Sequence, residues 1–131
     1  MNQNEHLKYW IDTSEQDFNT MLHLYGTKDY HWSLFIGHLV IEKLLKAVYV
    51  KKQDSNVPRL HDLLRIADLA GLNTNDEQKD MLDLITTFNI SARYPDYKQS
   101  FYKKCTEEFT TQSIAKIKEL RSWLLLILAQ K

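Results

Sequence analysis

The chain has 131 residues, of which 44% are hydrophobic and 26% are charged, an ordinary composition for a single soluble globular domain. Its 17 basic and 17 acidic side chains cancel, so the overall charge gives no attraction for non-specific nucleic-acid binding, although a local basic patch is still compatible with it. Three glycines and two prolines are too few for the turns of a β-sandwich and favour long helices. We expect one all-α domain over residues 1–131.

The first two helices are predicted to be antiparallel neighbours. Apolar residues recur at helical spacing over residues 4–25, where Gly26 ends the stripe, and again over residues 29–52. The connection between the two is very short, which places the helices side by side. The apolar arc of the segment 29–52 is so wide that several neighbours must pack against it. We therefore expect this segment to be the central helix.

The second half of the chain predicts three more helices. A polar turn over residues 53–59 leads to a short helix over residues 60–70, and a further helix runs from about residue 74 to Arg93. Pro95 forces Tyr94 out of helical geometry, so residues 94–105 are expected to form a loop. Thr106 then caps the last helix. The predicted fold is an up-and-down bundle of four long helices plus one short helix.

Location and redox state can also be predicted. The single cysteine, Cys105, has no partner for an internal disulfide, which suits a reducing cytoplasm. It directly precedes a predicted helix start, where the pKa of a thiol could fall. The N-terminal stretch lacks the apolar core of a secretory signal, and the longest apolar run, residues 123–129, is far shorter than the ~20 residues that span a bilayer. We expect a cytoplasmic protein that does not insert into membranes.

A polar seam crosses the predicted central helix. His38, Glu42 and Lys46 follow one another at intervals of four and therefore share one face. Glu42 precedes Lys46 in the favourable orientation for an ion pair. His38 and Glu42 also have the spacing of two metal ligands, but the chain holds no second pair of this kind, and metal sites in bundles need ligands from several helices. The sequence predicts no metal site and no cofactor.

The segment that follows the fourth predicted helix has the most distinctive chemistry. Arg93, Tyr94, Asp96 and Tyr97 place a guanidinium among aromatic faces. Such groups can hold a phosphate and stack a base. The alternative is that the tyrosines pin the segment to the bundle while its charges face water, which aromatic residues in loops do more often.

Taken in order, several segments resemble the HEPN domain family (higher eukaryotes and prokaryotes nucleotide-binding). Residues 42–47, EKLLKA, are similar to the EKxLKA motif of that family and follow His38. The segments LHDLL at residues 60–64 and ARYPDY at residues 92–97 also match, and the resemblance covers nearly the whole chain.

The resemblance implies an all-α bundle that usually dimerises and has a cleft near the fourth helix. Many family members act with a minimal nucleotidyltransferase, often in toxin–antitoxin systems. One branch consists of metal-independent ribonucleases whose motif is an arginine and a histidine separated by four to six residues. After Arg93, the corresponding positions hold Lys98, Gln99 and Ser100. Since acid–base catalysis needs a group that moves a proton, this chain lacks the proton-moving half of the motif.

Three hypotheses follow. The leading one is a non-catalytic binding module for a nucleotide, RNA or another phosphate-bearing ligand, acting as a homodimer, with a nucleotidyltransferase partner, or both. The second is a metal-independent ribonuclease that uses His61, His38 or Tyr97 as an atypical proton carrier. The third is a purely structural interaction domain whose polar seam only stabilises the bundle. For the leading hypothesis, we predict no catalytic residue and a ligand site formed by Arg93, Tyr94, Asp96, Tyr97, Lys43, Lys46, Glu42 and His38.

Overall fold

The structure is a computed structural model that describes residues 1–130, and all the regular structure in this range is helical. The six helices are α1 (Gln3–Gly26), α2 (Tyr30–Lys52), α3 (Leu63–Leu69), α4 (Asp76–Arg93), α5 (Pro95–Lys104) and α6 (Glu107–Ala129). The predicted all-α class and the four long helices are confirmed. The predicted number of short helices is wrong, because α5 occupies residues that were expected to form a loop.

Pro95 explains both the end of α4 and the existence of α5. Tyr94 adopts an extended conformation (φ −91°, ψ 130°), as expected for a residue before proline. Pro95 then occupies the first turn of α5, where its fixed φ suits a helix and its missing N–H is not needed. Phe101 is the one buried residue of this helix. With a single apolar anchor, the segment shows no helical stripe in its sequence.

The spacing of Thr74 and Glu77 predicts a capping box for α4, but the structure places the cap one residue later, at Asn75. The Asn75 side chain accepts a hydrogen bond from the Gln78 amide at 2.7 Å, and the Gln78 side chain accepts one from the Asn75 amide at 2.9 Å. This reciprocal capping box competes with Thr74 and Glu77, which have the same spacing. Asparagine is as good an N-cap as threonine, so the sequence alone did not decide the register.

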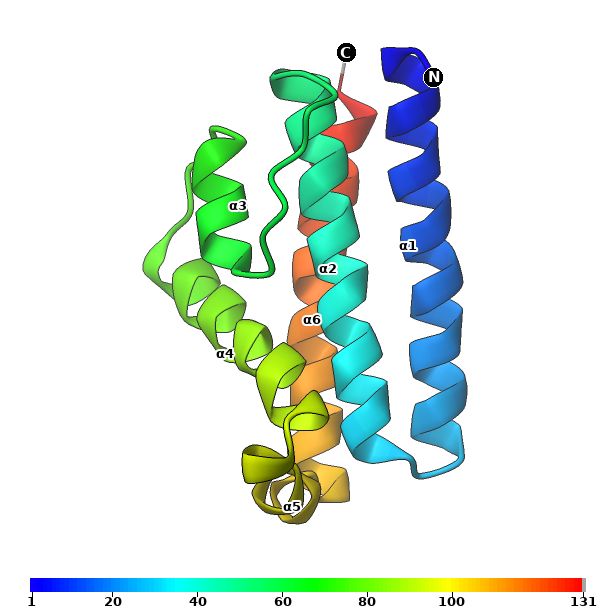
Figure 1. Ribbon diagram of the computed structural model, residues 1–131, viewed down its shortest axis with the longest axis vertical. Helices are drawn as coiled ribbons and strands as arrows, with labels where there is room; N and C mark the ends of the chain where they lie inside the picture. Colours follow the sequence, from blue (N-terminus) through cyan, green and yellow to red (C-terminus); the bar gives the residue numbers. More distant parts are fainter. Residues whose placement is uncertain (131) are drawn as a thin grey trace.

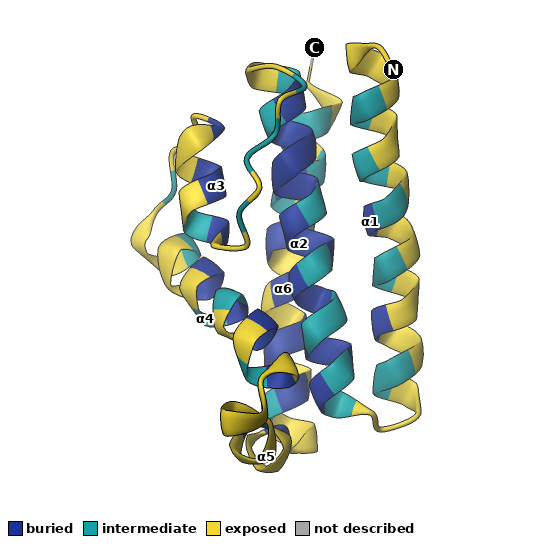
Figure 2. Ribbon diagram, in the orientation of Figure 1, coloured by how far each residue is buried: buried dark blue, intermediate teal, exposed yellow. Residues whose placement is uncertain are grey.

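Helix α2 lies at the centre of the bundle and packs against each of the other helices. Figure 1 shows α1 and α6 running alongside it, α4 crossing at a tilt with α3 above, and α5 turned away at one end. Fourteen of the 23 residues of α2 are buried, and it is the most continuously buried helix in Figure 2. Among residues 1–130, no helix combines the length and apolar character that a bilayer-spanning segment needs.

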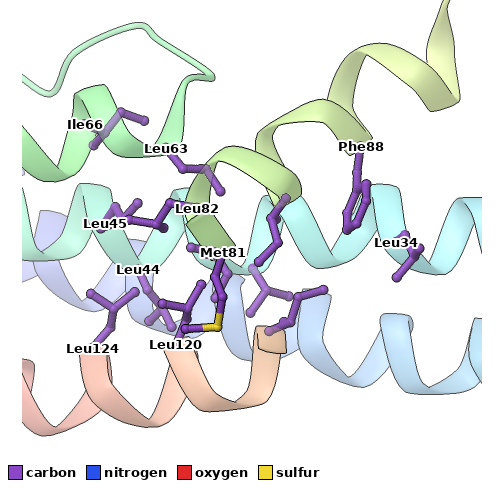
Figure 3. Packing of buried hydrophobic residues seen from close by; sticks show 14 of the residues in the cluster. Leu34, Leu44, Leu45, Leu63, Ile66, Met81, Leu82, Phe88, Leu120 and Leu124 are labelled. Carbon is purple, nitrogen blue, oxygen red and sulfur yellow. The ribbon is translucent and has the colours of Figure 1, made fainter. Parts of the chain in front are cut away.

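The hydrophobic core forms where α2, α3, α4 and α6 converge. Figure 3 shows apolar side chains from these helices turned toward one another. Gly37 lets α2 pack closely against α6 and α1, because a Cβ at this position would lie 2.5 Å from Cδ1 of Ile117 on α6 and 3.1 Å from the sulfur of Met21 on α1. The largest fully buried side chains are Phe88, Met21, Leu34, Ile41, Leu44, Leu45, Leu63, Ile66, Leu82, Ile85, Ile117 and Leu120.

Candidate functional site

The polar seam of α2 is buried inside the bundle. Glu42 is 5% exposed and Lys46 is 8% exposed, and the Lys46 ammonium lies 3.2 Å from Oε2 of Glu42. The same ammonium lies over the ring of Trp10 on α1, 5.4 Å from the ring centre, where a cation–π contact stabilises it. The predicted pair therefore forms as a desolvated ion pair rather than as a solvated one.

His61 joins this seam from the connection between α2 and α3. Its Nδ1 donates a hydrogen bond to Oε1 of Glu42 at 2.7 Å, and its backbone carbonyl accepts one from Nε2 of His38 at 2.9 Å. The His38 and Glu42 side chains of α2 thus hold the residue at the end of this connection in place. The His61 side chain itself is 61% exposed. A buried carboxylate therefore holds an accessible imidazole.

Arg93, the last residue of α4, is held in place by Asn89. Its Nε donates to the Asn89 carbonyl at 3.2 Å, and a terminal nitrogen donates to the side-chain oxygen of Asn89, which is 3% exposed. The guanidinium carbon lies 5.6 Å from the ring centre of Phe35 and 5.7 Å from that of Tyr94. Within residues 1–130, no carboxylate forms a salt bridge with it. The result is an oriented guanidinium that forms no salt bridge with residues 1–130.

One cavity is lined by both His61 and Arg93. It has a volume of about 380 Å³ and lies where α4 meets the residues that precede α3. His61 and Arg93 line the same cavity although they come from different elements. The search by sequence spacing did not place His61 beside Arg93, because it considered only histidines close to Arg93 in the chain. His61 is distant in sequence and comes close to Arg93 only in the folded structure. The lining residues are His61, Asp62, Thr86, Asn89, Ile90, Arg93 and Tyr94.

The other residues of the predicted ligand site lie in different surroundings. Lys43 forms a 2.7 Å ion pair with Asp17 and so joins α2 to α1. Tyr97 lines a separate hollow of about 140 Å³ between α4 and α5. Asp96 is exposed in the first turn of α5. Of the eight predicted residues, the cavity is lined by Arg93 and Tyr94, while the His38, Glu42 and Lys46 seam reaches it only through His61.

Two larger grooves offer less suitable chemistry for a phosphate. The groove between α4 and α6, about 490 Å³, is lined by Glu77, Asp80 and Glu119 with one lysine, so it would repel an anion. A groove of about 410 Å³ between α1 and α6 is mainly apolar. The cavity at Arg93 therefore suits an anionic ligand better than either of these two grooves.

Metal-binding and thiol chemistry receive no support from the geometry. Within the described part of the chain, no group of three or more His, Cys, Asp or Glu side chains is arranged to hold a metal ion. Cys105 is 6% exposed, and burial raises the pKa of its thiol to about 12. The sequence-based expectation of a lowered pKa is therefore wrong, because the burial of the thiol outweighs the opposing charge of Lys104.

His38 should make the stability of the protein depend on pH. Burial lowers its pKa below the ordinary 6.5, and the hydrogen bond to the His61 carbonyl opposes this shift only in part. Its Nδ1 is buried and has no hydrogen-bond partner among residues 1–130. Below pH 6.5, His38 becomes protonated in the unfolded chain but stays neutral in the folded protein. The unfolded state therefore binds more protons. The free energy of unfolding should therefore fall as the pH drops through 6.5 and level off below the folded pKa.

Urea denaturation between about pH 7.5 and pH 5 measures this effect. His38→Gln can still donate to the His61 carbonyl but does not titrate, so its loss of stability on acidification should be smaller than that of the wild type. His31, whose pKa burial also lowers, contributes to both proteins and cancels in the comparison. An exposed control, His23→Gln, should follow the wild type. Equal slopes for the wild type and His38→Gln would contradict the prediction.

Comparisons with known proteins agree with the architecture. The family model described as HEPN domain matches residues 7–128. Among solved structures, the chain is similar to the crystal structure of TT1696 from Thermus thermophilus, with a TM-score of 0.78 and 17% identity over 95% of this chain and 98% of that chain. At this identity the likeness shows the fold alone. A comparison with curated proteins gave no match. Because the family model covers nearly the whole sequence, the chain belongs to the HEPN domain family.

Proposed function

We propose that the cavity at Arg93 binds a phosphate-bearing ligand, either a nucleotide or RNA. The observation that carries this proposal is the Arg93 guanidinium, which Asn89 orients, two aromatic rings flank and no carboxylate within residues 1–130 engages in a salt bridge. Guanidinium groups bind phosphate through paired, charge-assisted hydrogen bonds. Membership of the HEPN family supports, in general terms, a nucleotide-binding or ribonuclease-type module.

The shape and lining of the cavity suit such a ligand. Its volume of about 380 Å³ lies within the usual range for small-molecule sites. Tyr94 and Ile90 are 51% and 50% exposed, so apolar surface is available beside the cation. A phosphate at Arg93 would leave a base free to stack on the Tyr94 ring.

Arg93→Gln should weaken binding of a nucleoside monophosphate or a short RNA by about 10- to 100-fold, the range expected when a charged hydrogen bond worth ~1.5–3 kcal/mol is lost. Isothermal titration of both proteins with each ligand measures the effect. Lys118→Gln removes the same charge from an exposed position on α6 and should bind like the wild type. If the wild type binds neither ligand, or if both variants lose affinity equally, Arg93 does not form the site.

A second candidate is a metal-independent ribonuclease, and the pairing of His61 with Glu42 favours it. The His61 imidazole lies 2.7 Å from a buried carboxylate and lines the cavity of a guanidinium that forms no salt bridge with residues 1–130, so it would be the proton carrier that the sequence spacing lacks. RNA incubated with the protein in EDTA should be cleaved, and His61→Gln should slow this cleavage by about 10²- to 10⁴-fold. His23→Gln, at an exposed position on α1, is the matched control. Cleavage that is absent, or insensitive to His61→Gln, would contradict this candidate.

We also propose, from the family resemblance, that the chain forms a homodimer and acts with a nucleotidyltransferase partner in the cytoplasm. A second copy or a partner would add its own groups around the exposed ligand site. Light scattering on the purified protein measures the self-association. A monomer at all tested concentrations would remove the homodimer from the proposal.

A further inference from the structure

His38 and His61 form hydrogen bonds that require opposite tautomers. Nδ1 of His61 lies 2.7 Å from Oε1 of Glu42, and a carboxylate oxygen accepts, so the proton of the neutral His61 ring is on Nδ1. Nε2 of His38 lies 2.9 Å from the His61 carbonyl oxygen, which also accepts, so the proton of the neutral His38 ring is on Nε2. The hydrogen-bond partners thus assign a different reactive nitrogen to each ring.

The tautomer of His61 leaves its accessible nitrogen free. With the proton on Nδ1, the lone pair of the neutral ring is on Nε2, which forms no hydrogen bond with any residue from 1 to 130. The side chain is 61% exposed and lines the cavity that Arg93 shares. A proton acceptor and a phosphate-binding cation therefore line the same space.

Glu42 can hold this tautomer because it cannot easily turn away. Its side chain is 6% exposed, and its second oxygen pairs with Lys46 at 3.2 Å. Rotation of the carboxylate would leave the Lys46 ammonium without its partner in a desolvated position, which is costly. The carboxylate therefore presents a fixed acceptor to Nδ1 of His61.

We propose that Glu42 is a positioning residue that holds His61 in the Nδ1–H tautomer, so that Nε2 accepts a proton from a hydroxyl group of a ligand whose phosphate lies at Arg93. The proposal rests on the ribonuclease candidate above. In this step the hydroxyl O–H bond breaks, the Nε2–H bond forms, and the electron pair stays on the hydroxyl oxygen. The Glu42 carboxylate then stabilises the imidazolium.

Two-bond ¹H–¹⁵N spectra of the imidazole rings at about pH 8, recorded without ligand, test the tautomers. His61→Gln and His38→Gln assign the two rings. We expect the Nδ1–H form for His61 and the Nε2–H form for His38 in the wild type. The double variant Glu42→Met/Lys46→Met removes the acceptor without leaving a buried ammonium, so His61 should shift toward Nε2–H while His38 stays unchanged. Arg93→Gln should alter neither ring.

A wild-type His61 in the Nε2–H form, or an Nδ1–H form that persists in the double variant, would overturn the proposal. If the double variant does not fold, the wild-type spectrum decides alone. The test is independent of the proposed function because no ligand is present. If His61 has the Nδ1–H form but no RNA is cleaved, the ribonuclease candidate is refuted and Glu42 still positions His61. If RNA is cleaved but His61 has the Nε2–H form, only the positioning role of Glu42 is refuted.

Discussion

Glu42→Met should lower the free energy of unfolding by about 3–5 kcal/mol, because the substitution leaves the ammonium of Lys46 buried without its carboxylate. Lys46→Met should also destabilise the protein, because it leaves the carboxylate of Glu42 buried without the Lys46 ammonium. The double variant removes both charges and replaces them with side chains of similar length, so its stability should lie near that of the wild type. Urea denaturation of the four proteins at neutral pH gives the coupling energy directly.

The exposed pair of Lys8 and Asp12 provides the matched control. It has the same spacing of four residues on α1, but the two side chains are 76% and 51% exposed. Water stabilises either partner when the other is removed, so Lys8→Met should change the stability little. If the losses for Glu42→Met and Lys46→Met simply add in the double variant, the two charges are not energetically coupled inside the bundle.

Phe88→Ala should destabilise the protein by about 3–5 kcal/mol, the usual range for deleting a large aromatic side chain from a core. Phe88 is 1% exposed, and its ring centre lies 5.6 Å from that of Phe101 on α5 and 6.2 Å from that of Phe109 on α6. The substitution therefore removes packing from three helices together. Thermal and urea unfolding measure the loss, and the exposed control Ile90→Ala should lie within about 0.5 kcal/mol of the wild type.

The same variant should loosen α5 more than the rest of the bundle. Phe101 is the single buried residue of α5, so it loses its aromatic partner when Phe88 is removed. Amide hydrogen exchange should show faster exchange in α5 than in α2, whose core contacts lie on several helices. Phe88→Leu retains most of the apolar contact and should have a smaller effect on both measurements. Unchanged protection of α5 in Phe88→Ala would show that Phe101 does not anchor it through this contact.

Periodicity predicted the helices with the strongest apolar stripes. The central position of α2 followed from an apolar arc too wide for one neighbour, and the end of α4 followed from the steric effect of Pro95 on Tyr94. Helix α5 could not be predicted in this way, because one buried phenylalanine makes no stripe. The close packing at Gly37 was equally invisible in the sequence, since the side chains that a Cβ there would meet lie on α1 and α6.

In the candidate site, too, some features could be predicted from the sequence and others required the tertiary structure. The sequence by itself determined the helical fold class, the position of the Arg93 guanidinium at the end of α4, and the spacing that pairs Glu42 with Lys46, because backbone sterics and helical repeat are local properties, whereas phosphate binding by Arg93 stays a prediction. Only the tertiary structure decided that this pair is desolvated and that His61 lines the same cavity as Arg93. Burial and the meeting of distant segments depend on how helices pack. A search for a histidine at a fixed spacing from Arg93 therefore could not find His61, which Glu42 of α2 hydrogen-bonds at the edge of the cavity.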